Sequence, residues 1–305
     1  MDLSILIASW NTRELLAQCL ESVYANPPTG EFEIIVVDNA SVDGSVGMVR
    51  ERFPQVILIE NSENVGFARA NNQAICNSQG EYVLLLNSDV IALPATFELL
   101  LELMDANPRA GAAGPILLNP DGSFQASYND FPTLLREGLA LIGPIKRRWE
   151  PYYPSHRPEV SRRTRTVDWM GGACLIVRRT CIDQIGLLDE RTHMYGEEVD
   201  WCYRMKQAGW STVYCADAAV IHLGGGSSTA YSVSRHMAIQ RGKVYFFRKH
   251  RSRGAARTMV GMVRVTNLAK ALAMVPAMKL RPDASQVRAR FVAYWAAVRE
   301  PLQYP

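Results

Sequence analysis

The chain has 305 residues, 48% of them apolar and 21% charged, which is enough for one large α/β domain with an appendage. Its net charge of +3 hides an asymmetry: residues 1–226 hold 18 basic and 28 acidic side chains, whereas residues 227–305 hold 15 and 2. An acidic body with a basic tail indicates an anionic partner for the tail, such as a membrane surface.

The six cysteines include no Cys-x-x-Cys pair, and most lie in apolar surroundings. This spacing argues against a disulfide framework or a zinc site and predicts buried thiols in a reducing compartment, for which we expect the cytoplasm. The N-terminus enters an apolar strand directly, without the basic region and cleavage site of a secretory signal, so none is expected.

Strands and helices alternate in the first half of the chain. Asn11, with Glu14 three residues later, has the pattern of a helix cap. This alternation predicts a right-handed, doubly wound, mostly parallel sheet, whose ligands bind at the carboxyl ends of the strands. The expected strands are Leu3–Ser9, Glu33–Asp38, Val56–Glu60 and Tyr82–Asn87, and the expected helices are Leu15–Ala25, Gly66–Ser78 and Pro94–Ala106.

The region 123–166 mixes proline, aromatic residues and basic clusters, and predicts a long acceptor-side loop with one helix near Leu134–Leu141. Regular structure is expected to return with a strand region, two helices and a final strand before Gly224, Gly225 and Gly226. These later elements are Val167–Arg178, a short helix from Thr180, a helix over Gly196–Ala208 and a strand over Thr212–His222.

Residues 227–305 are expected to form a basic helical appendage. Thr258–Met278 is largely apolar but contains Arg264, Asn267, Lys270 and Pro276. Each central Arg or Lys costs about 2.5–3.5 kcal/mol in a membrane, which roughly cancels the gain from the apolar residues. We therefore expect a helix at the membrane surface rather than a span; the alternatives are packing on the acidic body and oligomerisation.

Asn87-Ser88-Asp89 closes an apolar strand. Such a polar triplet is commonly just a turn, but a carboxylate here can also bind Mg²⁺ or Mn²⁺, which would neutralise a diphosphate leaving group. Asp89 is the expected metal ligand, with Asn87 offering only a neutral carbonyl. His222 follows an apolar strand and is a candidate third ligand type, although a lone histidine there is more often a surface residue.

Glu197, Glu198 and Asp200 lie in the first turn of a predicted helix. Acids there are favoured by the helix dipole alone, but one of them can also deprotonate an acceptor hydroxyl. Asn64, Gly66 and the nearby Asn72 form a strand-to-helix connection that either is a simple turn or holds a nucleotide through amide groups. The chain has no Walker loop and no Gly-x-Gly-x-x-Gly after a strand, which argues against kinase and dinucleotide functions.

Five motifs in order carry a specific resemblance. They are Ile7-Ala8-Ser9-Trp10-Asn11, Val36-Val37-Asp38-Asn39-Ala40-Ser41-Val42-Asp43-Gly44-Ser45, Asn64-x-Gly-Phe-Ala, Leu86-Asn87-Ser88-Asp89 and Tyr195-Gly-Glu-Glu-Val-Asp-Trp-Cys-Tyr-Arg. Over residues 3–226 the chain resembles glycosyltransferase family 2, in its rhamnosyltransferase-like branch. The resemblance implies a GT-A fold over residues 1–226, an inverting mechanism and a divalent metal.

The resemblance also implies site roles. For the nucleotide, Asp38 would bind the pyrimidine ring, and Ser9, Asn11, Asn64, Gly66, Asn72 and Asn87 would surround the donor. Asp89 and His222 would bind the metal, and Gly171, Gly172 and Ala173, with Trp169 nearby, would face the acceptor. Glu198 matches the usual base, with Asp200 and Glu197 as alternatives. Two departures stand out: Asn87 replaces a common aspartate, and Glu198 is one methylene longer than the usual aspartate.

The resulting hypothesis is an enzyme that moves a sugar, with rhamnose from dTDP-rhamnose as the leading choice, onto a lipid-linked saccharide during polysaccharide synthesis. We expect it to act as a peripheral protein at the inner face of the cell membrane. The alternatives are transfer of N-acetylglucosamine or galactofuranose from a UDP-sugar to a soluble acceptor, with the tail serving homo-oligomerisation, and a non-catalytic nucleotide- or glycan-binding module. A nucleic-acid partner is not expected, because the body is acidic and the tail lacks a recognisable binding module. Among Trp10, Trp169, Trp201 and Trp210, the last is the expected core residue.

Overall fold

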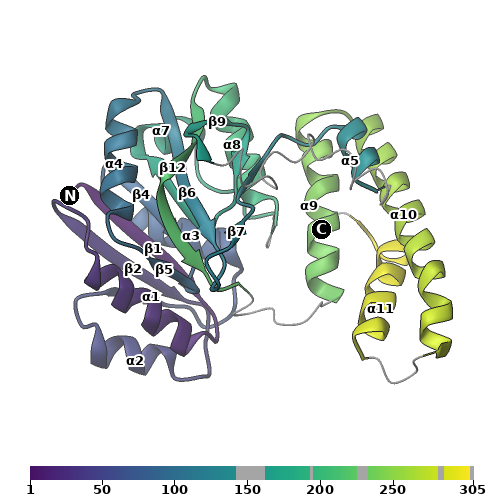
Figure 1. Cartoon of the computed structure of the whole chain (residues 1–305), viewed down its shortest axis with the longest axis horizontal. Helices are drawn as coiled ribbons and strands as arrows, with labels where there is room; N and C mark the ends of the chain where they lie inside the picture. The colour runs from purple at the N-terminus through teal and green to yellow at the C-terminus, as the bar shows by residue number, and fades with distance from the viewer. Residues whose placement is uncertain (142–161, 193–194, 225–232, 281–284, 303–305) are drawn as a thin grey trace. The chain divides into compact units, whose positions relative to one another are not determined.

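A computed structural model describes residues 1–141, 162–192, 195–224, 233–280 and 285–302. The chain divides into two compact units, which are described separately (Figure 1). Unit 1 contains the β-sheet and its covering helices. Unit 2 contains α5 (Leu134–Leu141), α9 (Val233–His250), α10 (Arg253–Leu280), α11 (Ser285–Arg299) and the described residues of the segment 191–197. The sequence instead predicted both α5 and the segment 191–197 to lie in the GT-A domain expected over residues 1–226.

The sheet of unit 1 has the strand order β3-β2-β1-β4-β11-β6-β12-β5, with β7 paired to β6 and β9 to β12. Strands β3, β2, β1 and β4 are parallel, β11 is antiparallel to both β4 and β6, and β6 and β12 are parallel. The sheet is therefore mixed and mostly parallel, as the strand-helix alternation predicted. The bounds are β1 Leu3–Ser9, β2 Phe32–Asp38, β3 Ile57–Glu60, β4 Tyr82–Leu86, β5 Val90–Ala92, β6 Ala110–Leu118, β7 Phe124–Gln125, β9 Arg165–Val167, β11 Cys174–Arg178 and β12 Ser211–His222.

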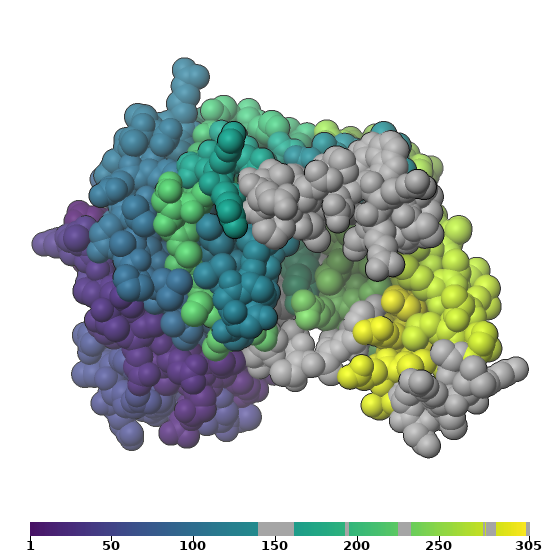
Figure 2. Space-filling model, in the orientation of Figure 1, coloured from purple at the N-terminus to yellow at the C-terminus, as the bar shows by residue number. Residues whose placement is uncertain are grey.

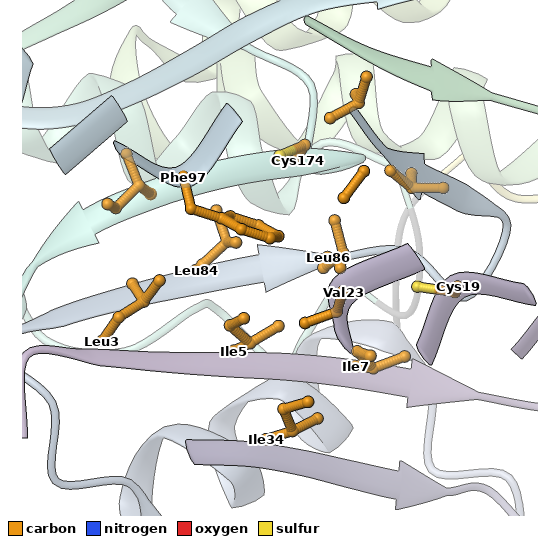
Figure 3. Packing of buried hydrophobic residues seen from close by; sticks show 14 of the residues in the cluster. Leu3, Ile5, Ile7, Cys19, Val23, Ile34, Leu84, Leu86, Phe97 and Cys174 are labelled. Atoms are coloured by element: carbon orange, nitrogen blue, oxygen red, sulfur yellow. The ribbon is translucent and has the colours of Figure 1, made fainter. Parts of the chain in front are cut away.

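Helices cover both faces of the sheet because its central strands are apolar on both sides. On one face, Leu3, Ile5 and Ile7 pack with residues of α1 (Arg13–Ala25), α2 (Ser45–Arg52) and α4 (Thr96–Ala106) (Figure 3). On the other face, Leu6 and Leu85 pack with residues of α3 (Phe67–Asn77), α7 (Arg179–Ile185) and α8 (Glu197–Gln207). This two-sided core holds the carboxyl ends of β1, β2 and β4 at one sheet edge.

Several expectations from the sequence were wrong in detail. The central strand β6 was not predicted, and residues 123–129 contain β7 and the short strand β8 (Tyr128–Asn129) where a loop was expected. Asn11 does not cap α1: the cap position is Thr12, and Asn11 has a left-handed φ of 52°. Trp201 is fully buried, whereas Trp210 is half-buried and donates to Gln184, so Trp201 takes the core role.

Unit 2 is helical, with a core shared by α9, α10 and α11. Met237, Phe247, Met259, Val263 and Ala297 belong to this core. All six cysteines of the chain are free thiols, and all but Cys76 are buried, as the cysteine spacing predicted.

The length and composition of one described helical segment, Arg253–Pro276, satisfy the criterion for a membrane span, with a mean hydropathy of 1.2. Only 22% of the 18-residue stretch that has this hydropathy is buried inside the structure. Core helices of soluble proteins meet the same criterion, so the expectation of a surface helix stays a prediction.

Candidate active site

The carboxyl ends of β1 and β2 bring Ser9 and Asp38 side by side. The two residues are register partners, and Asn39 donates its backbone N–H to the carbonyl of Ser9 at 2.8 Å. Asp38 is 2% exposed; its Oδ2 accepts the backbone N–H of Ser41 at 2.8 Å. Its Oδ1 is buried with no hydrogen-bond partner among the described residues. A buried carboxylate oxygen in that state requires a hydrogen-bond donor from a water or a ligand.

Asn11 lies beside Asp38 but acts on the protein itself. Its Oδ1 accepts the backbone N–H of Val42 at 2.8 Å, and its own N–H donates to Ser41 Oγ at 2.9 Å. Asp43 then accepts the N–H of Arg13. Asn11 therefore shapes the loop that follows β2, and it borders the expected nucleotide site without turning its amide oxygen toward it.

The connection before α3 contains Asn64 and Gly66. Asn64 Oδ1 accepts the N–H of Gly66 at 3.0 Å, and Gly66 has a φ of 87°. That positive φ explains the glycine, because other residues rarely adopt it. The hydrogen bond makes the connection a local turn at the start of α3.

Asn72 has a structural role that the sequence did not reveal. Its Nδ2 donates to the Leu188 carbonyl and to Glu190 Oε1, both at 2.9 Å, and its Oδ1 accepts the Leu188 N–H. The amide is therefore engaged on both sides with residues 188–190. It fixes the segment that leads toward α8 rather than facing a nucleotide.

The triplet after β4 is tied to the β1 end. Thr12 Oγ1 bridges Ser9 Oγ and Ser88 Oγ, each at 3.0 Å. Asp89 is 8% exposed, and its charge contributes, after burial, to raising the pKa of the Cys19 thiol behind it. The backbone carbonyl of Asp89 accepts the N–H of Leu223, so the triplet lies against the end of β12.

This arrangement joins Asp89 to His222. Nε2 of His222 lies 3.3 Å from Oδ1 of Asp89. Nδ1 of His222 lies 2.6 Å from Oε1 of Gln125 on β7. Two residues 133 positions apart in sequence (222 − 89) thus form one carboxylate–imidazole pair, and Gln125 is a member of the site that no sequence pattern indicated.

The acceptor-side candidates lie on the loop between β10 (Trp169–Met170) and β11. The carbonyl of Ala173 accepts the N–H of Asn87 at 2.9 Å, and Gly171 donates to the Ser127 carbonyl at 2.8 Å. A Cβ on Gly172 would meet the ring of Phe67 at 3.5 Å. The loop therefore lies directly beside the Asn87-Ser88-Asp89 triplet. Trp169 Nε1 donates to the Asp130 carbonyl at 3.0 Å and is half-buried.

The three acids at the start of α8 have different environments. Asp200 is 1% exposed and pairs with Arg204, with Oδ2 at 2.9 Å from Nε. Glu197 is 4% exposed, whereas Glu198 is half-buried. The thiol of Cys202, one turn after Glu198, hydrogen-bonds to the backbone of Met170, which ties α8 to the end of β10. Of the three acids, Glu198 has the most accessible side chain.

The donor set at this edge fits a divalent metal in part. Asp89 and His222 supply one hard oxygen and one imidazole nitrogen, which suit Mn²⁺ or Mg²⁺ with further ligands from a diphosphate. Within the described residues, no group of three or more His, Cys, Asp or Glu side chains forms a complete metal site. Among the described residues, the pair therefore offers two candidate ligands and not a complete metal site.

Comparisons with known proteins decide the family. The sequence profile described as glycosyl transferase family 2 matches residues 4–185. The chain belongs to this family. It is also 36% identical, over 72% of its length and 76% of the relative's, to an N-acetylglucosaminyl-diphospho-decaprenol L-rhamnosyltransferase of Mycobacterium tuberculosis. It is 26% identical, over 72% of its length and 67% of the relative's, to a low-salt glycan biosynthesis hexosyltransferase of Haloferax volcanii.

Solved structures confirm the fold. A mannosyltransferase from Pyrobaculum calidifontis in complex with GDP-Man and Mn²⁺ aligns with a TM-score of 0.58 at 16% identity, covering 97% of this chain and 87% of its own. TarS 1–349 of S. aureus aligns with a TM-score of 0.53 at 14% identity, covering 98% and 90%. This family 2 chain is a glycosyltransferase with a GT-A fold, as the five motifs predicted.

Proposed function

We propose that this family 2 glycosyltransferase is a metal-dependent, inverting enzyme that transfers rhamnose from dTDP-rhamnose to a lipid-linked saccharide acceptor at the inner face of the cell membrane, for polysaccharide synthesis. The single observation that carries the donor and acceptor is the 36% identity to the decaprenol-linked rhamnosyltransferase over three quarters of that protein. The site supports it with Asp38 Oδ1, a buried oxygen that has no partner among the described residues, and with the Asp89–His222 pair.

Donor binding would use the ends of β1 and β2. Asp38 Oδ1 would accept a hydrogen bond from the N–H of the pyrimidine ring, which satisfies the buried oxygen. Asp89 and His222 would hold Mn²⁺ or Mg²⁺, which when bound stabilises the charge that develops on the departing diphosphate. Asn87 would stand beside them with a neutral amide, so metal affinity should depend on the donor's phosphates.

Transfer would use Glu198. Its carboxylate would take the proton of an acceptor hydroxyl as that oxygen forms a bond to the anomeric carbon. The bond from the anomeric carbon to the diphosphate oxygen breaks with its electron pair going to the leaving group. Because attack and departure occur on opposite faces of one carbon, a single displacement inverts its configuration. Asp200 would not act as base, since its carboxylate pairs with Arg204.

The test is a panel of dTDP-, UDP- and GDP-sugars, each with and without Mn²⁺ or Mg²⁺, on a polyprenyl-diphosphate-linked N-acetylglucosamine acceptor. We expect metal-dependent transfer from dTDP-rhamnose. Glu198→Gln should lower kcat by at least about 100-fold while leaving dTDP affinity unchanged, because general-base catalysis contributes on that order. Glu102→Gln, on the exposed side of α4, is the matched control. Transfer by the Glu198→Gln variant at the wild-type rate would exclude Glu198 as the base.

A further inference from the structure

The long helix α10 has two apolar faces. Its buried residues Ala256, Met259, Val263, Asn267 and Ala271 recur every three or four positions and face the core of unit 2. On the opposite side the exposed residues include Val265 at 69%, Leu268 at 37% and Leu272 at 60% exposure. At 100° per residue these three share one stripe, which we call the outer strip. Side chains of α10, drawn in yellow-green, form part of the surface seen in Figure 2.

The surroundings of the outer strip are basic. Arg253, Arg257 and Arg264 are exposed and lie along one border of the strip on the helical projection. Small or apolar residues, Gly254, Thr258, Gly261 and Pro276, extend the strip in both directions and are also exposed. The helix has no acidic residue, and residues 227–305 hold 15 basic and 2 acidic side chains in all. The strip is thus apolar at its centre and cationic at its edge.

Helix α11 repeats this combination on a smaller scale. Val292 and Trp295 are 52% and 37% exposed, and Arg288 and Arg299 lie on the same helical face. The guanidinium of Arg299 lies 6.0 Å from the centroid of the Trp295 ring. Tryptophan and arginine together are typical of the boundary between lipid headgroups and acyl chains, where each residue keeps its polar end in water.

We propose that the outer strip of α10 docks in the plane of an anionic phospholipid bilayer, with Val265, Leu268 and Leu272 inserted below the headgroups and the bordering arginines on the phosphates. A second copy of the chain does not suit this surface, because two such basic faces repel each other. Nucleic acid would use the arginines but gain nothing from the apolar strip. An anionic membrane uses both features.

Insertion in the plane also fits the buried side of α10 better than a span does. That side carries Asn267, whose Oδ1 lies 2.9 Å from Nε2 of His236 on α9. A transmembrane α10 would have to leave α9 and α11 and expose this polar pair to lipid. In-plane docking leaves the three-helix core intact.

The test uses vesicles and the full chain without donor or acceptor, so that failure of the proposed sugar transfer cannot affect it. Wild-type protein should co-sediment with vesicles of phosphatidylcholine and phosphatidylglycerol, and much less with phosphatidylcholine alone. The double variant Val265→Ser/Leu272→Ser should bind anionic vesicles at least about tenfold more weakly, since two exposed apolar side chains lose their insertion energy. Val42→Ser, which removes a valine that is 91% exposed in unit 1, should bind like the wild type.

Three results would overturn the proposal. One is equal vesicle binding by the double variant and the wild type. Another is bound protein that resists extraction by alkaline carbonate, which would indicate a span. The third is a wild-type dimer in light scattering that the double variant converts to a monomer, which would assign the strip to self-association. Release of bound protein by high salt with retained circular dichroism would support docking at the surface.

A different observation carries a second inference, which rests on the proposed metal role of His222. Gln125 Nε2 donates to Asn119 Oδ1 at 2.9 Å and approaches the His222 carbonyl at 3.3 Å. Both of these groups are acceptors, so the orientation of the Gln125 amide is fixed and its Oε1 faces His222 Nδ1 at 2.6 Å. Nδ1 must then carry the proton, and in the neutral ring the lone pair of Nε2 points toward Asp89.

We infer that Gln125 is a positioning residue that holds His222 in the tautomer able to bind a metal. Second-layer partners of this kind typically change metal affinity by about 10–100-fold. Gln125→Leu should therefore weaken Mn²⁺ binding, measured calorimetrically with dTDP present, by about tenfold or more, and should shift the ¹⁵N signals of His222 toward a mixture of tautomers. Gln125→Glu keeps an acceptor for Nδ1–H, so it should keep the ¹⁵N signals of the Nδ1-protonated ring, but its second oxygen faces the Asn119 oxygen and should restore Mn²⁺ affinity only in part. Unchanged Mn²⁺ affinity and unchanged ¹⁵N signals in a folded Gln125→Leu protein would refute the inference.

Discussion

Replacing Gly242 by alanine would place a methyl group against the turn that starts α8, the helix that carries the proposed base Glu198. Gly242 lies on α9, and a Cβ at this position would be 2.1 Å from the carbonyl oxygen of Tyr195 and 3.7 Å from Cα of Gly196. Non-bonded carbon–oxygen contacts close to no less than about 3.3 Å, so the turn must retreat by about 1 Å. Glu198 follows this turn within one helical turn of α8.

The kinetic consequence can be given a magnitude. A misplacement of about 1 Å of a catalytic group costs on the order of 100-fold in rate. We therefore expect Gly242→Ala to lower kcat about 100-fold while the affinity for dTDP stays within about twofold, because Asp38 and Asp89 are held by the sheet. Steady-state kinetics at saturating metal and calorimetry with dTDP measure the two quantities.

A matched control separates this effect from helix propensity. A Cβ on Gly261, in the middle of α10, would meet nothing within 4 Å. Gly261→Ala should stabilise its helix by up to about 1 kcal/mol and leave kcat unchanged. Wild-type kcat in a folded Gly242→Ala protein would refute the reasoning, since it would show that the turn moves without moving the base.

Two further predictions concern stability. Asp200→Asn leaves the Arg204 guanidinium without its buried counter-charge. The variant should lower the free energy of unfolding, measured by guanidinium titration, by about 3 kcal/mol. Its kcat per folded molecule should stay at the wild-type value, unlike that of Glu198→Gln. Burial, with smaller contributions from Lys270 and Lys243, lowers the pKa of His236 despite its bond to Asn267. Because the unfolded chain then binds a proton that the folded chain does not, urea stability should fall as pH drops below about 6.5, and His236→Gln should flatten that dependence.

The sequence predicted the parallel half of the sheet well because its strands are continuous apolar runs that end in polar residues. It failed at β6, whose sequence Ala-Gly-Ala-Ala-Gly-Pro-Ile-Leu-Leu has weak strand propensity. Packing opposes larger residues here: a Cβ on Gly111 would be 2.8 Å from both Cys181 Sγ and Trp210 Cβ, and one on Gly114 would be 2.9 Å from the backbone carbonyl oxygen of Cys174. Close packing between distant elements overrides local preference here.

The candidate site was likewise predicted in part from the sequence. Motifs correctly placed Asp38 and Asp89 at strand ends, because chain order in a parallel sheet determines which ends meet. They did not predict that Asn72 hydrogen-bonds to residues 188–190 or that Gln125 hydrogen-bonds to His222. These contacts join segments 116 and 97 positions apart in sequence, respectively. Amide side chains carry no signal of their partner in a single sequence.

Donor-side and acceptor-side groups are therefore supported differently. Asp38, Ser88 and Asp89 depend on strand ends and on the Ser9–Thr12–Ser88 hydrogen bonds. Glu198 depends on the first turn of α8, which begins in a segment of unit 2 where Gly196 packs on Gly242. Substitutions that move the turn before α8 should consequently lower kcat and leave nucleotide affinity unchanged. Substitutions at the strand ends should lower nucleotide affinity and leave kcat at saturating donor unchanged. If the outer strip of α10 docks on the membrane that holds the acceptor, unit 2 both carries the protein to the lipid and contains the turn that directly precedes the proposed base Glu198.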